Sequence, residues 1–315
     1  MHVLGIDAGA TKTVCLLADT DGAVVSEGRG LGANLHVAGE AGVETTLRDV
    51  MAKAIGDRGV RPAAICVGIA GVDRDDEARA VQAIVRNISP DSRVLVVNDA
   101  LIALAAGAHD APGIVINAGT GSITYGRNRA GEAARAGGWG HMVGDEGSGY
   151  WIGREAVAAV MRASDGRGPA TRLTGEILRH FDVADVSRLP RIVYDREVPR
   201  VNVAALGPIV SRVAETGDTV AVRIVERAAD ELALAARSVT ARLEMRDQAF
   251  AFYLTGGAFH VVPRLVEELA RRLAEVAPRS HVQQLTQEPA MGAVWLALAE
   301  ARGGARIPRY KMADG

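Results

Sequence analysis

Two stretches of this chain, roughly a hundred residues apart, carry the same order of residue types. GIDAGATKT spans residues 5–13 and VINAGTGSIT spans residues 115–124; in each, an apolar run leads through Asp or Asn and Ala-Gly into a turn rich in glycine and hydroxyl groups. Apolar runs at 2–6 and 13–18 flank the first turn, which is the pattern of a β-hairpin. The recurrence predicts two related half-domains, not a solenoid of short repeats.

The residue types in both turns suit phosphate binding. Glycine lets backbone N–H groups approach phosphate oxygens closely, and Thr and Ser hydroxyls add donors. Asp7 ends the first strand and is placed to hold Mg2+ through water, because Mg2+ keeps much of its hydration shell. Thr255-Gly256-Gly257 adds a third glycine turn after a strand expected at 249–255. Two such hairpins facing each other across a cleft would grip a polyphosphate from two sides.

The first part of the chain alternates strands with helices. The spacing of apolar residues predicts a third strand at 23–27, helices over 40–55, 78–88 and from Ala100, and strands at 63–69 and 94–97. A second hairpin is expected at 113–117 and 122–126, followed by a glycine-rich stretch at 136–151. This order is that of an α/β protein.

The rest of the chain is expected to be largely helical. A long amphipathic helix over 218–244 carries one apolar stripe, made of Ile224, Ala228, Leu232, Ala235, Val239 and Leu243. Further helices are expected at 263–276 and 289–301, and the tail after Arg302 is expected to be frayed.

Composition excludes several classes of partner. The chain has 315 residues, enough for two cores, and its net charge of −2 comes from scattered acids and bases. We therefore expect neither a nucleic-acid-binding face nor a membrane-binding patch. Cys15 and Cys66 lie in apolar runs, so we expect buried thiols, not a disulfide or a metal site. The sequence opens directly on a strand, which favours a cytoplasmic protein without a leader.

IDAGATKT, INAGTGS and YLTGGA resemble the two phosphate loops and the adenosine loop of the sugar kinase, Hsp70 and actin superfamily. GGWGHMVGDEGSGYWIG, residues 137–153, resembles the signature of N-acetylglucosamine kinases within the BadF/BadG/BcrA/BcrD ATPase family. The resemblance covers essentially the whole chain. It implies an α/β fold of two RNase H-like lobes, an actin-like ATPase fold, with ATP and Mg2+ in the cleft between them. It also implies transfer of the γ-phosphoryl group to the 6-hydroxyl of an amino sugar.

The resemblance assigns the catalytic carboxylate to Asp99, in VVNDALIAL. A carboxylate at the carboxyl end of a strand faces the region where ligands of α/β folds bind, and it can accept the proton of the attacking hydroxyl. The alternative is that Asp99 caps the helix that begins at Ala100. Asn98 is expected to cap or to bond backbone.

The same resemblance divides the other site residues into two sets. The nucleotide set comprises Asp7 (also the Mg2+ residue), Gly9, Ala10, Thr11, Lys12, Gly119, Thr120, Gly121, Gly256, Gly257 and Ala258. The acceptor set comprises Asn34, Asp99, Ser122, Gly138, Trp139, Asp145 and Glu146.

Several of these residues have alternative roles. Lys12 reaches a phosphate or is a solvated turn residue. Trp139 contacts the apolar face of a pyranose or fills the core. Asp145 contacts a sugar hydroxyl or places a charge at a helix N-terminus. Ile123 stands where several relatives have Asn, which leaves the 2-substituent of the sugar open.

The lobe boundaries are expected at 1–111, joined by the helix 290–302, and at 112–289. N-acetylglucosamine is the first candidate acceptor, with glucosamine and N-acetylmuramic acid as alternatives. A second class is an ATPase that activates a radical dehydratase or reductase through an iron–sulfur cluster held by paired cysteines. A third is a non-catalytic sugar sensor. The segment 160–215 and the helix from 218 offer surface for a homodimer.

Overall fold

The chain is organised around two β-sheets, and the computed structural model describes residues 1–72, 75–194 and 200–311. The first sheet has the strand order β3-β2-β1-β4-β5. Its strands are β1 (His2–Ala8), β2 (Lys12–Ala18), β3 (Val24–Leu31), β4 (Pro62–Ile69) and β5 (Arg93–Asn98). β1 pairs antiparallel with β2 but parallel with β4, and β4 pairs parallel with β5. The carboxyl ends of β1, β4 and β5 therefore meet at one edge of the sheet.

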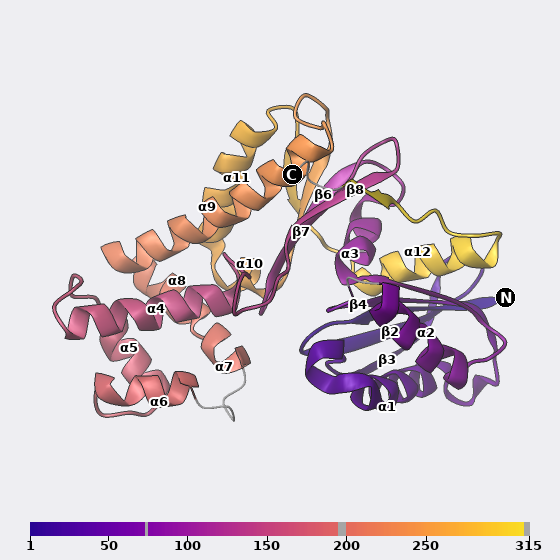
Figure 1. Ribbon diagram of the computed structural model, residues 1–315, viewed down its shortest axis with the longest axis horizontal. Helices are drawn as coiled ribbons and strands as arrows, with labels where there is room; N and C mark the ends of the chain where they lie inside the picture. The colour runs from indigo at the N-terminus through magenta and orange to yellow at the C-terminus, as the bar shows by residue number, and fades with distance from the viewer. Residues whose placement is uncertain (73–74, 195–199, 312–315) are drawn as a thin grey trace. The chain divides into compact units, whose positions relative to one another are not determined.

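Four helices cover the two faces of this sheet (Figure 1). They are α1 (Leu35–Ile55), α2 (Asp75–Ile88), α3 (Asp99–Ala108) and α12 (Pro289–Ala301). α1 and α2 lie on one face, whereas α3 and α12 lie on the other. A Cβ on Gly292 of α12 would come 1.9 Å from the carbonyl oxygen of Ile102, so this glycine lets α12 approach α3 closely. The packing of α12 against α3 and β1 places this C-terminal helix in the same unit as the N-terminal strands.

The second sheet repeats the plan of the first. Its order is β10-β9-β6-β7-β8-β11. The strands are β6 (Gly113–Ala118), β7 (Ser122–Arg127), β8 (Glu132–Gly137), β9 (Ala251–Thr255), β10 (His281–Gln284) and β11 (Arg309–Tyr310). From β8 to β10 the sequence of neighbours matches that from β3 to β5, with β6 in the place of β1. This shared order confirms the internal repeat that the two hairpin motifs predict.

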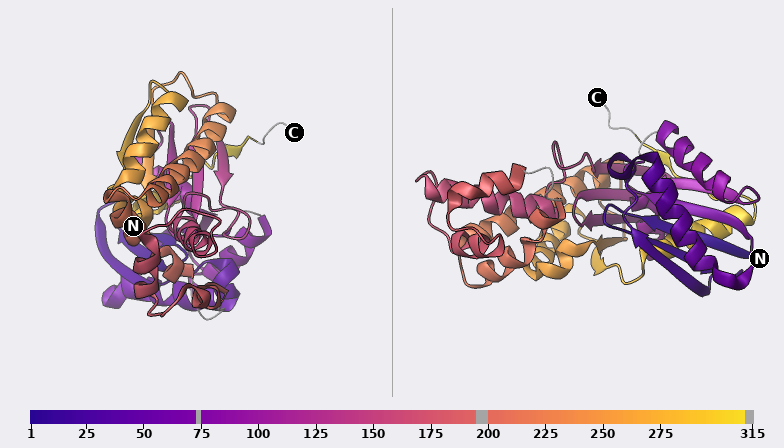
Figure 2. Two further views of the ribbon diagram at one scale, coloured as in Figure 1. Left: turned by 90° about the vertical axis from the view of Figure 1, so that its left-hand side faces the viewer. Right: turned by 90° about the horizontal axis from the view of Figure 1, so that it is seen from below.

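The helices of the second half form two groups. α9 (Thr219–Arg242) and α11 (Pro263–Val276) pack side by side, and α10 (Gly257–Val261) precedes α11. α4, α5, α7 and α8 gather around one another, with α6 nearby in the chain (Figure 2). Their bounds are α4 (Gly149–Ser164), α5 (Leu173–His180), α6 (Leu189–Tyr194), α7 (Arg200–Ala204) and α8 (Gly207–Glu215).

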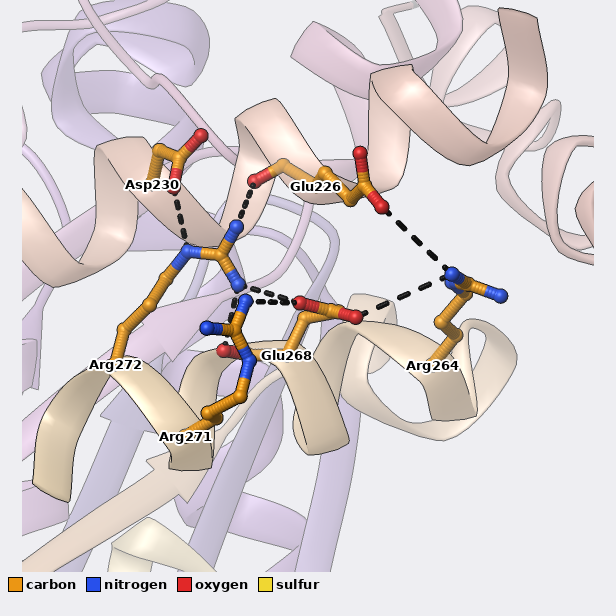
Figure 3. Close-up of polar contacts among 6 residues, drawn as sticks. All are labelled: Glu226, Asp230, Arg264, Glu268, Arg271 and Arg272. Atoms are coloured by element: carbon orange, nitrogen blue, oxygen red, sulfur yellow. Dashed lines mark hydrogen bonds and ion pairs between the residues drawn. The ribbon is translucent and has the colours of Figure 1, made fainter. Parts of the chain in front are cut away.

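An ionic network joins α9 to α11 (Figure 3). Arg272 on α11 contacts Asp230 at 2.5 Å and Glu268 at 2.6 Å, and it donates to the carbonyl oxygen of Glu226 at 3.3 Å. Only 14% of the Arg272 side chain is exposed, so its guanidinium needs these partners. Arg264 contacts the carboxylates of Glu226 and Glu268 at 3.7 and 4.0 Å, and the more exposed Arg271 contacts Glu268 at 2.9 Å. The network fixes the position of α11 along α9.

The chain divides into two compact units, which do not follow a single cut in the sequence. Among the described residues, the first unit contains those of 1–113, 126–133 and 285–310, and the second contains those of 114–125 and 134–284 together with Lys311. The turn of the β7–β8 hairpin thus groups with the first unit, whereas the sequence predicts all of 112–289 in the second.

Other differences from expectation are local. Within the tail after Arg302, Arg309–Tyr310 are not frayed, because β11 pairs parallel with β8, and residues 312–315 lie outside the described residues. On α9 the buried residue of the central turn is Ala236, whereas Ala235 is partly exposed. Cys15 and Cys66 are fully buried free thiols, as expected, and burial raises the pKa of each. Within the described ranges, no helix is long and apolar enough to cross a membrane.

Candidate active site

Two predicted site carboxylates come together at the carboxyl edge of the first sheet. Asp7 lies opposite Gly68 on β4, and Ile69 of β4 lies opposite Asn98 on β5, immediately before Asp99. Asp7 is 9% exposed. Burial, and next the negative charge of Asp99, raise the pKa of Asp7 to about 7, while Lys12 opposes the shift. A cation at this edge would relieve both the burial cost and the repulsion.

Asp7 predicts a pH dependence of stability. Its carboxyl has an ordinary pKa of 3.8, but titrates near 7 in the folded chain. Between these values the folded state binds more protons than the unfolded state, so the free energy of unfolding falls as pH rises and levels off above the folded pKa. The full loss is roughly 4 kcal/mol at 1.36 kcal/mol per pKa unit.

Urea unfolding at about pH 5 and pH 8 measures this loss. We expect the Asp7→Asn variant to lose most of the difference between the two pH values, and to be more stable than the wild type at the higher one. Asp91→Asn is the matched control, since Asp91 is an exposed partner of Arg61. An Asp7→Asn variant with the wild-type pH dependence would contradict the assignment.

Asn98 and Asp99 have separate positions at the start of α3. The Asn98 side chain accepts a hydrogen bond of 2.9 Å from the backbone N–H of Ala100, which makes Asn98 the N-cap. The alternative role of Asp99 as the cap is therefore wrong. Asp99 is the first residue of the helix and is partly exposed, close enough to Asp7 to affect its pKa.

The first phosphate-loop candidate joins β1 to β2. The N–H of Gly9 donates to the carbonyl oxygen of Lys12 at 3.0 Å, and the N–H of Ala33 donates to the carbonyl of Gly9. A Cβ on Gly32 would lie 2.2 Å from the carbonyl oxygen of Ala10, so the chain before α1 packs tightly on this loop. Ala10, Thr11 and Lys12 remain exposed. The loop is thus fixed by backbone contacts on its inner side, while residues 10–12 are exposed on its outer side.

Lys12 forms an ion pair, whereas a solvated turn residue would have no partner. Its ammonium contacts Glu288 at 3.1 Å, and Arg29 contacts the same carboxylate at 3.2 Å. Glu288 immediately precedes α12 and also raises the pKa of Asp7. Glu288 was not predicted from the sequence, because its only local signal is an acid before the proline that begins a helix.

The second phosphate-loop candidate joins β6 to β7 and has a similar turn. The N–H of Gly119 donates to the carbonyl oxygen of Gly121 at 2.9 Å. The carbonyls of Gly119 and Thr120 accept from Gly149 and Tyr150, the first residues of α4, at 2.9 and 3.4 Å. The loop is therefore anchored to the start of α4.

Asp145 lies against this loop. It is buried, has a left-handed backbone with φ of 59°, and accepts a hydrogen bond of 3.2 Å from the N–H of Ser122. A Cβ on Gly121 would lie 2.8 Å from its carboxylate. Burial raises the pKa of Asp145. The N-cap of α4 is Ser148, so Asp145 does not cap that helix.

Two other acceptor residues are oriented by backbone bonds. The hydroxyl of Ser122 donates to the carbonyl oxygen of Glu146 at 2.7 Å, which ties β7 to the 137–146 segment. The carbonyl of Asn34 accepts from the N–H groups of Val37 and Ala38 at the start of α1.

Trp139 does not fill the core. It is 65% exposed, and the guanidinium of Arg135 lies 4.8 Å from its ring centroid. Gly138 has φ of 75°, and a Cβ there would lie 2.9 Å from the side chain of Ile123. The Trp139 side chain is therefore exposed on a glycine-rich turn. Arg135 lies over one face of its ring, and the exposed ring surface can contact a planar or apolar partner.

His141 and Arg200 extend the same segment. Arg200, the first residue of α7, contacts Nδ1 of His141 at 3.1 Å, and the His141 ring stacks edge-on with Tyr150. Because arginine only donates, Nδ1 of His141 must be the acceptor. Burial and the charge of Arg200 lower the pKa of His141, which favours this neutral form. No sequence motif pointed to Arg200.

The adenosine-loop candidate follows β9. Gly256 has φ of 105° and ψ of 153°, and precedes α10. A Cβ there would come 2.4 Å from the carbonyl carbon of Ala118, at the end of β6. Gly257 has open space around it, and Ala258 is buried. The third glycine turn is thus packed directly against the base of the second phosphate loop.

The carboxylate of Asp7 is the one metal-ligand candidate that the sequence predicts. Over the described parts of the chain, no group of three or more His, Cys, Asp or Glu side chains could enclose a metal ion. Cys15 and Cys66 are buried in β2 and β4, which disfavours a shared cluster between subunits. Asp7 fits an ion bound largely through water and ligand phosphates.

Comparisons with known proteins agree with the fold. The profile of the BadF/BadG/BcrA/BcrD ATPase family matches residues 4–297. The N-acetylmuramic acid/N-acetylglucosamine kinase of Clostridium acetobutylicum is 34% identical over 302 residues, covering 95% of this chain and 99% of that protein. The N-acetyl-D-glucosamine kinase of Dictyostelium discoideum is 32% identical, covering 94% and 97%. A Chromobacterium violaceum structure, provisionally named an N-acetylglucosamine kinase, has 27% identity, a TM-score of 0.75, and coverage of 94% and 98%.

Proposed function

Because the chain belongs to the BadF/BadG/BcrA/BcrD ATPase family, we propose that it transfers the γ-phosphoryl group of ATP to the 6-hydroxyl of an amino sugar, with N-acetylglucosamine as the first candidate. The observation that carries this proposal is the pair of carboxylates, Asp7 and Asp99, at the carboxyl edge of a parallel sheet beside an open glycine loop. Kinases of known mechanism use one carboxylate to hold the metal–nucleotide and another to accept the proton of the attacking hydroxyl.

In this mechanism the two carboxylates act in turn. The oxygen of the sugar hydroxyl bonds to the γ-phosphorus while the bond between the γ-phosphorus and the β-phosphate oxygen breaks. Asp99 accepts the proton that this hydroxyl loses. Asp7 would hold Mg2+ through water, and an ion bound there would supply positive charge to neutralise the phosphates. Lys12 exchanges its contact with Glu288 for a phosphate oxygen.

The other predicted residues bind and orient. Gly9, Ala10 and Thr11, together with residues 119–121, present backbone donors to the phosphates, and residues 256–258 contact the adenosine. Trp139 supplies a face for the pyranose ring, and Asp145 accepts from a sugar hydroxyl. Asn34, Ser122, Gly138 and Glu146 complete the acceptor set.

ADP release from ATP and Mg2+ tests the proposal directly. The acceptor panel is N-acetylglucosamine, glucosamine, glucose and no sugar, with phosphate placement on the product determined by NMR. We expect strong stimulation by N-acetylglucosamine and phosphorylation at the 6-hydroxyl. Slow ADP release that no sugar stimulates would contradict the kinase proposal and favour an activator ATPase, for which a brown, anaerobically purified protein is the marker.

We also propose that the enzyme is cytoplasmic. It acts on a small molecule, so the proposal includes neither a nucleic acid nor a membrane partner. The helical surface of 160–215 and α9 is the candidate homodimer surface, and light scattering during size-exclusion chromatography would measure the molar mass.

A further inference from the structure

One carboxylate oxygen of the first unit lies between two cations. Oε1 of Glu288 is 3.1 Å from Nζ of Lys12 and 3.2 Å from Nη1 of Arg29. The two cations come from neighbouring strands, since Lys12 begins β2 and Arg29 lies on β3. A single oxygen atom at this position therefore contacts both cations. A phosphate oxygen is also negatively charged and accepts the same charge-assisted hydrogen bonds.

Glu27 orients the Arg29 guanidinium independently of Glu288. Nε and Nη2 of Arg29 donate to the two carboxylate oxygens of Glu27 at 3.0 and 3.2 Å, while Nη1 donates to Glu288. An anion that replaced the Glu288 carboxylate would thus meet a guanidinium that Glu27 already holds in place. Such preorganisation lowers the cost of binding.

Arg29 also projects from the same face of the sheet as the candidate metal residue. Arg29 lies opposite Val14 on β2, and Val14 lies opposite Asp7 on β1. Residues opposite each other on neighbouring strands share a face, and two strand spacings separate the backbones of Arg29 and Asp7 by roughly 10 Å. Lys12 and Glu288 both act on the pKa of Asp7, in opposite directions. The two cations therefore lie beside the edge of the sheet where phosphates are proposed to bind.

We propose that Lys12 and Arg29 together bind one phosphate group of the nucleotide, and that Glu288 is the internal anion that this phosphate displaces. Glu288 then competes with the nucleotide for both cations. Removal of its charge should strengthen nucleotide binding, whereas removal of either cation should weaken it. This inference rests on the proposed function; it adds Arg29 to the nucleotide site and makes Glu288 the internal competitor of that site.

Calorimetric titration with ATP and with inorganic tripolyphosphate, each with Mg2+, tests the competition without sugar turnover. Glu288→Gln keeps the shape of the side chain and removes the charge from two ion pairs, so both Kd values should fall by about 3- to 10-fold. A loss of structure does not produce a gain of affinity, so this result separates competition from misfolding. Unchanged or weaker binding of both ligands by Glu288→Gln would overturn the proposal.

Variants of Arg29 test the second cation. Arg29→Gln should raise both Kd values by about 5- to 30-fold, and Arg29→Lys should recover part of the loss, since it keeps the charge without the planar fork. Arg61→Gln is the matched control, because Arg61 is an exposed arginine of the same unit paired with Asp91 at 3.0 Å. Wild-type Kd values in Arg29→Gln, or an equal loss in Arg61→Gln, would contradict the role of Arg29.

The double variant measures whether Arg29 and Glu288 act on the same ligand. In the Arg29→Gln background, Glu288→Gln should give a smaller gain of affinity than in the wild type, because one of the two cations that it frees is gone. Equal gains in both backgrounds would show that Glu288 does not compete for Arg29.

Turnover separates this inference from the proposed function. If no sugar stimulates ADP release but the Kd values follow the expected pattern, the kinase proposal fails alone. If N-acetylglucosamine is phosphorylated while Arg29→Gln and Glu288→Gln both bind ATP as the wild type does, the two-cation site fails alone.

Discussion

Replacing Asp99 with asparagine is expected to lower kcat for sugar phosphorylation by about 10²- to 10⁴-fold, the usual contribution of a positioned proton acceptor. The amide keeps the shape of the side chain and cannot take the hydroxyl proton. Asp99 begins α3 at the carboxyl edge of the sheet, close enough to Asp7 to influence its pKa. Steady-state kinetics with saturating acceptor measures the change, and a nucleotide titration should give nearly the wild-type Kd for ATP.

Asn98 is the matched control for that variant, because the two residues are adjacent and have different contacts. Asn98→Ala removes the hydrogen bond to the N–H of Ala100, so it should lower the free energy of unfolding by about 1 kcal/mol. Its kcat should stay within a few-fold of the wild type. If Asp99→Asn kept full activity, or if both variants lost activity in parallel with stability, Asp99 would have no proton-transfer role.

The Asp7 charge also bears on the Asp99 experiment. Asp99 raises the pKa of Asp7, so an uncharged residue at position 99 should lower it toward its ordinary value. The Asp99→Asn variant should therefore be more stable than the wild type at about pH 8, above the folded pKa of Asp7, where the cost of burying its charge is fully expressed. Loss of activity with gained stability would separate a chemical effect from misfolding.

Much of the fold was predictable because its signals are local. Each hairpin is defined by two apolar runs and a glycine turn, and α11 and α12 both begin with a proline. The unpredicted elements depend on distant partners. β10 has little buried surface of its own and forms by pairing with β9, and β11 is two residues that pair with β8. No periodicity within four residues or fewer could indicate such strands.

The candidate site divides in the same way. Glycines and carboxylates that belong to continuous motifs, such as 5–13 and 137–153, could be identified from the sequence. Glu288 and Arg200 could not, because their partners are Lys12 and His141, far away in the chain. The exposed position of Trp139 was also undecidable from its residue type, since the core and a sugar face use the same aromatic surface.

Replacing Gly256 with alanine should produce the largest loss of nucleotide affinity among single-methyl substitutions in the second unit. With φ of 105° and ψ of 153°, Gly256 has a backbone conformation that is essentially restricted to glycine. The added Cβ would also lie 2.4 Å from the carbonyl carbon of Ala118 and 2.6 Å from the side-chain oxygen of Asn117. Backbone strain and overpacking together should cost at least about 3 kcal/mol of unfolding free energy.

The added methyl group cannot be accommodated without moving the end of β6, where residues 119–121 begin. If residues 256–258 and 119–121 bind the nucleotide as proposed, strain at Gly256 should displace residues 119–121, and the Kd for ATP and for ADP should both rise. Gly257→Ala is the folding control, because nothing lies within 4 Å of its added Cβ; its thermal midpoint should stay close to that of the wild type. If Gly256→Ala matched Gly257→Ala in stability and bound both nucleotides normally, the packing of this turn against β6 would not support nucleotide binding.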